Sequence, residues 1–225
     1  MKKYIVISLL SGIMLLGCGG DTKNAQKSKK VTIKKRPIAL IPEHYGLEKF
    51  DQLDTLAFTF NVKKGEKMVK RHWIWSPKTQ KITSIIGQDT FSFFQNNLDS
   101  LSIPYNKKFI NDSYWMLFPF HLAWDKDFFD VTYGKGVAPI SGAALSKISI
   151  QYKKEGGYTP GDRYDIYWDA NLDIKEWSYF KEGDLSKSLH VTWDKPITEA
   201  GVTISTFHKT KADDFELWFD NIVFK

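Results

Sequence analysis

The sequence predicts a mainly β (α+β) fold built from antiparallel sheets, and three observations lead to this prediction. Apolar residues recur at every second position, as in Leu56-Ala57-Phe58-Thr59-Phe60, which is typical of strands with one buried face. Short segments with turn chemistry separate such stretches, among them Lys64-Gly65-Glu66 and Ser76-Pro77-Lys78. The long apolar runs alternating with helices that a parallel sheet needs are missing from the sequence.

The individual elements follow from the same patterns. Leu47, Phe50 and Leu53 predict one short amphipathic helix after Pro42. A second helix is predicted with Asn106 as its N-cap, because Ile110, Tyr114 and Leu117 then share one face. Alternation predicts strands over residues 56–62, 68–75, 81–86, 147–152, 164–168, 172–179, 189–194 and 215–224. The parity of apolar residues changes within 172–179, which predicts a β-bulge near Lys175-Glu176.

The N-terminus has the pattern of an export signal. Lys2 and Lys3 precede an apolar run, Tyr4 to Leu16, that is shorter than the roughly 20 residues needed to cross a bilayer. The following Leu15-Leu16-Gly17-Cys18 resembles the lipobox of bacterial lipoproteins. That resemblance implies a signal peptide over residues 1–17, cleavage before Cys18 and lipidation of its thiol; a plain signal peptide that contains a cysteine is the alternative. Cys18 is also the only cysteine, so we expect no disulfide.

Charge is divided unevenly along the chain. Residues 1–36 carry a net charge of +8 and the remainder −2. Because the basic residues fall in the leader and the polar segment 18–36, which we interpret as a flexible tether, we expect no nucleic-acid partner. The tether lacks the acidic cluster of some surface lipoproteins, which favours anchoring in the outer membrane with the body facing the periplasm.

Three segments of the body resemble LolA-like lipoproteins. His44–Phe50 followed by Leu53–Phe58 resembles the HGGLxxWxxLxTLxF opening of this family, with Tyr45 in place of a glycine and Phe50 in place of a tryptophan. Phe109–Phe120 is similar to its FxNDxYWLLxPF segment, and Gly157–Asp162 resembles a turn found in Bacteroidetes members. The resemblance implies that residues 37–225 form a single domain, an antiparallel half-barrel with a few short helices on its concave side, enclosing an apolar cavity.

Aromatic residues, 15% of the chain, are the candidates for lining that cavity. In segment 68–75, Trp73 and Trp75 share one face with Arg71. The full set of candidates is Phe58, Phe60, Trp73, Trp75, Trp115, Tyr164, Trp168 and Trp177. We therefore expect a membrane-anchored monomer that binds a lipid or the acyl chains of a lipoprotein without catalysis. The alternative for each ring is that it fills the core.

Other motifs are weaker. Asp169-x-Asn171-x-Asp173 matches the opening of a calcium loop, but Ile174 replaces the required glycine, so we expect a hairpin turn. The five histidines have no zinc-ligand spacing, and His121 is expected to be a hydrogen-bonded structural residue. No nucleophile elbow, phosphate loop or dinucleotide motif is present, so we predict neither an enzyme nor a cofactor. A glycosidase pair of distant carboxylates stays open.

Two further hypotheses concern the body as a whole. The segment Trp218-Phe219-Asp220-Asn221-Ile222 resembles the WxDNI-like last strand of glycan-binding jelly rolls. This favours a carbohydrate-binding β-sandwich as the alternative function. A purely structural envelope protein with a filled core is the third hypothesis.

Overall fold

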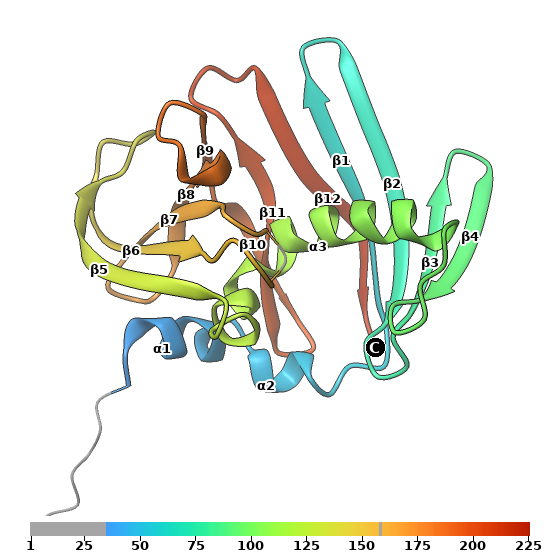
Figure 1. The fold of residues 1–225 in the computed structure, drawn as a ribbon. Helices are drawn as coiled ribbons and strands as arrows, with labels where there is room; N and C mark the ends of the chain where they lie inside the picture. Colours follow the sequence, from blue (N-terminus) through green and yellow to red (C-terminus); the bar gives the residue numbers. More distant parts are fainter. Residues whose placement is uncertain (1–34, 158) are drawn as a thin grey trace, which may run out of the picture. The chain divides into compact units, whose positions relative to one another are not determined.

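In the computed structural model, two antiparallel sheets face each other across the long helix α3 (Ser102–Trp124) (Figure 1). The structure describes residues 35–157 and 159–225, and residues 35–225 form one compact unit. The expected signal peptide, the lipidation site Cys18 and nearly all of the tether lie outside the described residues.

The first sheet has seven strands and the second has five. In spatial order, the first contains β10 (Asp194–Glu199), β11 (Val202–Lys209), β12 (Phe215–Phe224), β1 (Leu56–Lys64), β2 (Lys67–Ser76), β3 (Lys81–Ile86) and β4 (Asp89–Phe94). The second contains β5 (Phe129–Val137), β6 (Ala144–Tyr152), β7 (Arg163–Trp168), β8 (Ile174–Phe180) and β9 (Ser188–Thr192). Each predicted strand is present, and the mainly β, antiparallel fold class is confirmed. Strands β4, β5, β10 and β11 add to those predicted.

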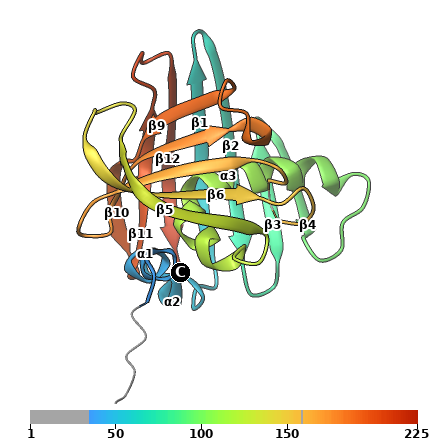
Figure 2. The same ribbon diagram turned by 60° about the vertical axis from the view of Figure 1, so that its left-hand side comes forward.

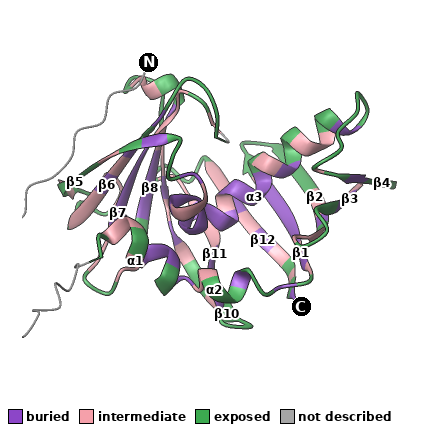
Figure 3. Cartoon of the chain, turned by 60° about the horizontal axis from the view of Figure 1, so that its bottom comes forward, coloured by how far each residue is buried: buried purple, intermediate pink, exposed green. Residues whose placement is uncertain are grey.

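The two sheets meet along one side. Trp193 carries the chain from β9 directly into β10, and the Thr192 carbonyl accepts a hydrogen bond from His208 Nδ1 of β11 at 2.9 Å. Within the described residues the sheets are not closed into a barrel, as an open half-barrel requires. Figure 2 shows the strands of the second sheet running crosswise to β1 and β12, and Figure 3 shows α3 lying between the sheets.

The helices differ from the prediction in extent. The structure contains α1 (Pro37–His44), which was not predicted, α2 (Leu47–Phe50) and the short 3₁₀ turn η1 (Lys181–Gly183). Helix α3 begins at Ser102, so the prediction of Asn106 as its N-cap is wrong. The reason is Asp99, whose Oδ1 accepts hydrogen bonds from the backbone N–H groups of Leu101 and Ser102 at 3.1 and 2.7 Å. This carboxylate satisfies amide donors at the helix start, and α3 reaches 23 residues.

Helix α3 fills the space between the sheets with aromatic side chains. Phe109 packs edge-on against Trp73 and Trp75 of β2, with ring centroids 5.5 and 5.4 Å apart. On the other side Phe118 packs against Trp177 of β8 at 4.9 Å. Burial on both faces explains why most residues of the helix after Lys108 are inaccessible to solvent (Figure 3).

Tyr45 holds the segment between α1 and α2 against both sheets. Its buried hydroxyl accepts a hydrogen bond from the Ile174 N–H at 2.9 Å, and its carbonyl accepts one from the Thr203 N–H at 2.9 Å. The departure from the glycine of the LolA-like pattern therefore has a structural role here. The neighbouring Gly46 is in the left-handed region with φ of 91°.

The β7–β8 hairpin confirms two local predictions. Tyr167 pairs with Glu176 and Trp168 with Ile174, so Lys175 is the extra residue of the predicted bulge. At the turn, Asp169 Oδ1 accepts hydrogen bonds from the N–H groups of Asn171 and Asp173 at 2.9 and 3.1 Å. The motif is the expected hairpin turn.

Candidate functional site

Three adjoining hollows lie between the two sheets, and we call them together the aromatic groove. The Tyr164 hollow has a volume of about 370 Å³, the Arg71 hollow about 290 Å³ and the Lys187 hollow about 360 Å³. Asn111 and Trp115 line both the first and the second hollow, and Leu189 and Phe215 line both the second and the third. These shared residues place the three hollows next to one another along the groove.

Helix α3 forms one wall of the groove. Its contributing residues fall at helical spacings of three, four, seven and eight, and they are Lys107, Ile110, Asn111, Tyr114 and Trp115. Residues at this spacing share one face of a helix, so a single stripe of α3 meets the groove. The opposite stripe, which includes Phe109, packs against β2.

The second sheet supplies an aromatic wall to the Tyr164 hollow. Trp177 and Tyr179 point to the same side because they are two residues apart on β8, after the bulge. The Tyr164 ring stacks on Trp177 with centroids 5.1 Å apart and an interplanar angle of 13°. Trp115 meets Trp177 edge-on at 4.5 Å. Contacts among these rings fix the wall before any ligand binds.

The first sheet supplies the Arg71 hollow. Phe60 and Val62 of β1 and Val69 of β2 make its surface apolar, and Arg71 is its cation. Arg71 is held by Asp112 of α3, which accepts from Nε at 2.6 Å and from Nη2 at 2.5 Å. Asp112 is fully buried and also accepts the indole N–H of Trp73 at 2.8 Å.

Polar groups of the Tyr164 hollow are shifted in pKa by burial. Removal from water raises the pKa of the Asp162 carboxyl, although its Oδ1 accepts the Glu182 N–H at 2.8 Å. Burial, assisted by the nearby Asp162, raises the pKa of Tyr179 to about 12. The Tyr179 hydroxyl is therefore a neutral hydrogen-bonding group at physiological pH.

The eight aromatic candidates from the sequence divide into two groups. Phe60, Trp115, Tyr164 and Trp177 line the Tyr164 hollow or the Arg71 hollow. Phe58, Trp73, Trp75 and Trp168 lie outside the lining of the three hollows. Phe58 and Trp73 are fully buried, while Trp75 and Trp168 are partly buried and pack against the core.

Sequence reasoning did not select several groove residues. Ile110 and Tyr114, four residues apart, share one face of α3, and Tyr179 shares the strand face of Trp177 beyond the bulge. Strand periodicity applied outward from Trp177 identifies Tyr179, whereas helical spacing from Trp115 leads to Lys107 and Asn111 and does not reach Ile110 or Tyr114.

His121 has the structural role expected for it. It is buried, and its Nδ1 lies 3.0 Å from Asp125 Oδ2. The same carboxylate oxygen accepts the Tyr152 hydroxyl at 2.7 Å. These groups lie in the core at the C-terminal end of α3 and do not themselves line the three hollows.

Comparisons with known proteins find a similar fold among solved structures. No protein-family profile matches the chain. No curated protein matches its sequence. Its fold is similar to the crystal structure of a DUF1329 family protein from Desulfovibrio piger, with a TM-score of 0.45 and 11% sequence identity, over 85% of this chain and 94% of that one.

The described residues contain neither a membrane-spanning helix nor a cluster of metal ligands. In residues 35–157 and 159–225, no helix combines the length and apolarity needed to span a membrane. The same residues contain no group of three or more His, Cys, Asp or Glu side chains arranged to hold a metal ion.

Proposed function

We propose that this protein is a lipid-anchored, LolA-like envelope protein that binds an apolar ligand, a lipid or acyl chains, in the aromatic groove and releases it unchanged. The observation that carries the proposal is the groove itself, whose Tyr164 hollow of about 370 Å³ is lined mainly by aromatic and aliphatic side chains. Ligand pockets combine this kind of apolar lining with a few placed polar groups. Binding and release need no covalent chemistry.

The apolar lining offsets much of the cost of binding an acyl chain. Burying one methylene contributes about 0.8 kcal/mol, so eight methylenes contribute about 6 kcal/mol. This is comparable with the cost of about 4–15 kcal/mol for the lost freedom of two associating molecules. The preformed ring contacts of Trp115, Tyr164 and Trp177 reduce the additional cost of ordering the site.

The proposed address rests on the N-terminal sequence. Lipidation of Cys18 would attach the protein to the outer membrane, with its body in the periplasm. A tethered protein of this kind acts locally, as a receptor, sensor or transfer station, and not as a carrier between membranes.

The test uses a chain of residues 23–225 and two variants of it. One replaces a tryptophan of the groove, and the other replaces a tryptophan on the opposite face of the first sheet. The chain is purified from bacteria under native conditions and examined by mass spectrometry for bound lipid, then delipidated and titrated with a fluorescent fatty acid. We expect Trp115→Ala to weaken probe binding about tenfold or more. Trp218→Ala is the matched control, because Trp218 lies on β12 beside the groove residue Leu217 and faces the opposite side. Absence of binding, or binding insensitive to Trp115→Ala, would contradict the proposal.

Carbohydrate binding is the second candidate, and one observation favours it. Partly exposed Trp218 pairs across β11–β12 with Phe207, whose ring lies 4.3 Å from Lys195 Nζ, beside a hollow of about 340 Å³. Aromatic faces flanked by charged groups are suited to stacking on sugar rings. This candidate predicts the reverse result: Trp218→Ala abolishes binding to an array of envelope glycans, and Trp115→Ala does not.

A further inference from the structure

Arg71 is a cation in a mainly apolar part of the groove. Its guanidinium carbon lies 4.9 Å from the centre of the Phe60 ring, and its side chain is 17% exposed. Val62, Val69 and Leu217 surround it in the lining of the Arg71 hollow. A charge in such surroundings must be paired, and buried Asp112 provides the partner.

One edge of the Arg71 guanidinium stays available to a ligand. Of its five N–H groups, Asp112 accepts one from Nε and one from Nη2. Among the described residues, no other group accepts a hydrogen bond from Arg71. Asn111, which also lines the hollow, donates to Asp112 Oδ1 at 3.0 Å and helps to fix the carboxylate. The remaining donors are therefore held in one plane, the geometry that binds a carboxylate or phosphate.

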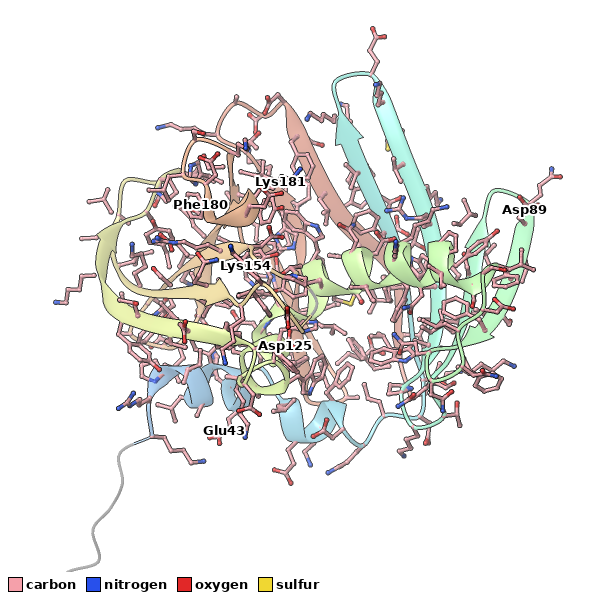
Figure 4. All side chains as sticks on the ribbon, viewed as in Figure 1. Glu43, Asp89, Asp125, Lys154, Phe180 and Lys181 are labelled. Atoms are coloured by element: carbon pink, nitrogen blue, oxygen red, sulfur yellow. The ribbon has the colours of Figure 1, made fainter. Side chains whose placement is uncertain are left out.

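The other charges of the groove favour an anion. Lys64, Lys181 and Lys187 line the Lys187 hollow with Asp214, and the Tyr164 hollow has Lys107 and Asp162. Lys187 pairs with Asp184, whereas Lys64, Lys107 and Lys181 have no ion-pair partner among the described residues. In Figure 4, Lys181 lies above α3, and Asp125 marks the C-terminal end of the helix. A groove in which bases outnumber acids attracts anionic ligands.

We propose that the ligand of the aromatic groove is an anionic amphiphile, and that the free edge of Arg71 binds its carboxylate or phosphate group. The acyl chain extends from the Arg71 hollow past Trp115, which lines both hollows, into the Tyr164 hollow. Asp112 is a positioning residue that orients Arg71. This inference rests on the proposed function, because it names the chemical class of the same ligand.

The experiment compares three ligands that share one chain: hexadecanoate, hexadecyl phosphate and hexadecan-1-ol. Each ligand is tested for its ability to displace a fluorescent fatty acid from the mature chain. The tether is kept, and lipid bound in the groove is removed beforehand. We expect wild-type protein to bind the better of the two acids at least tenfold more tightly than the alcohol. Whichever acid binds more tightly assigns the group as carboxylate or phosphate.

The main variant combines Arg71→Met with Asp112→Asn. Removing both charges leaves no unpaired carboxylate in the core, and the new amide oxygen can still accept the Trp73 indole N–H. We expect the preference for acid over alcohol to fall to less than threefold. If this variant does not fold, Arg71→Lys keeps a cation beside Asp112 without the planar fork, and we expect it to reduce the preference severalfold.

The matched control is Arg163→Met with Asp165→Asn. This pair has the same fork, Nε to Oδ1 at 3.0 Å and Nη2 to Oδ2 at 3.2 Å, over the ring of Phe180 and outside the groove lining. It should retain the wild-type preference. Equal wild-type affinity for acids and alcohol, or a preference that survives every folded Arg71 variant, overturns the inference and leaves the proposed function intact. Wild-type protein that binds none of the three ligands overturns the proposed function as well.

Discussion

Trp73→Phe and Trp115→Phe are the same chemical change at two sites that the structure treats differently. Trp73 is fully buried, and its indole N–H donates to the buried Asp112 carboxylate at 2.8 Å. Losing a hydrogen bond to a charged group costs about 1.5–3 kcal/mol, and the smaller ring adds about 1 kcal/mol of lost packing. Trp115 is partly exposed at the wall between two hollows, so the same change there should cost less than about 1 kcal/mol.

Urea unfolding measures this difference directly. With a slope of about 2 kcal/mol per molar urea, a loss of about 3 kcal/mol moves the midpoint by about 1.5 M, whereas Trp115→Phe should move it by less than about 0.5 M. Ligand affinity should show the opposite order, with the larger loss at Trp115. Equal midpoint shifts, or a larger shift for Trp115→Phe, would refute the assignment of Trp73 to the core and Trp115 to the groove.

The remaining predictions concern acid stability, a close backbone contact and the anchor. Burial lowers the pKa of His208 to about 4, below about 6.5 in the unfolded chain, so the unfolded state takes up the proton first as the pH falls. The free energy of unfolding should decrease by up to about 3 kcal/mol from pH 6.5 to 4. The variant His208→Asn can still donate to the Thr192 carbonyl but has no imidazole to protonate, so its urea midpoints should not show this decrease between pH 6.5 and 4. A pH dependence of the midpoint equal to that of the wild-type protein would contradict the prediction. Gly46→Ala should destabilise the protein by more than about 2 kcal/mol, because its Cβ would lie 2.1 Å from the Gly201 carbonyl oxygen. The Cβ of Gly65→Ala meets nothing within 4 Å, so this variant should cost about 1 kcal/mol. Thermal unfolding of both variants measures the difference. Cys18→Ala should abolish incorporation of labelled palmitate, and label that persists would refute the lipobox assignment.

Alternation predicted the strands whose two faces have different environments. It missed β10, an exposed edge strand without a regular apolar side. The edge strands β4 and β5 do alternate, through Phe91 and Phe93 and through Phe129 and Val131, and were left out of the prediction although the same rule applies to them. In β11 the alternation begun by Val202 and Ile204 ends at Thr206, a polar residue on the same side of the strand, whose hydroxyl donates to the Lys195 carbonyl at 2.8 Å. The helix start at Ser102 depends on the side chain of Asp99, a local polar contact that periodicity does not report.

The division of the aromatic candidates could not be read from the sequence for a related reason. Parity places Val69, Arg71, Trp73 and Trp75 on one face of β2, and they lie on one face. Parity does not say what covers each part of that face. Phe109 of α3 covers it at Trp73 and Trp75, while Arg71 and Val69, farther along the strand, line the open groove. The position of the helix therefore decides which residues are core and which can meet a ligand.

The ion pair between Arg71 and Asp112 bears on the function of α3 at this position. A buried ion pair is a poor means of attaching a helix to a sheet, since an apolar pair of similar volume often stabilises as well or better. Phe109, three residues before Asp112 on α3, already makes such apolar contacts with Trp73 and Trp75. Attachment alone thus gives no reason to place a charged pair at the next turn, where the chain meets the groove. A ligand acid that binds the free edge of Arg71 gives a reason for the charged pair. The cation must then be present and fixed in its plane, and Asp112 must neutralise it whenever the groove is empty.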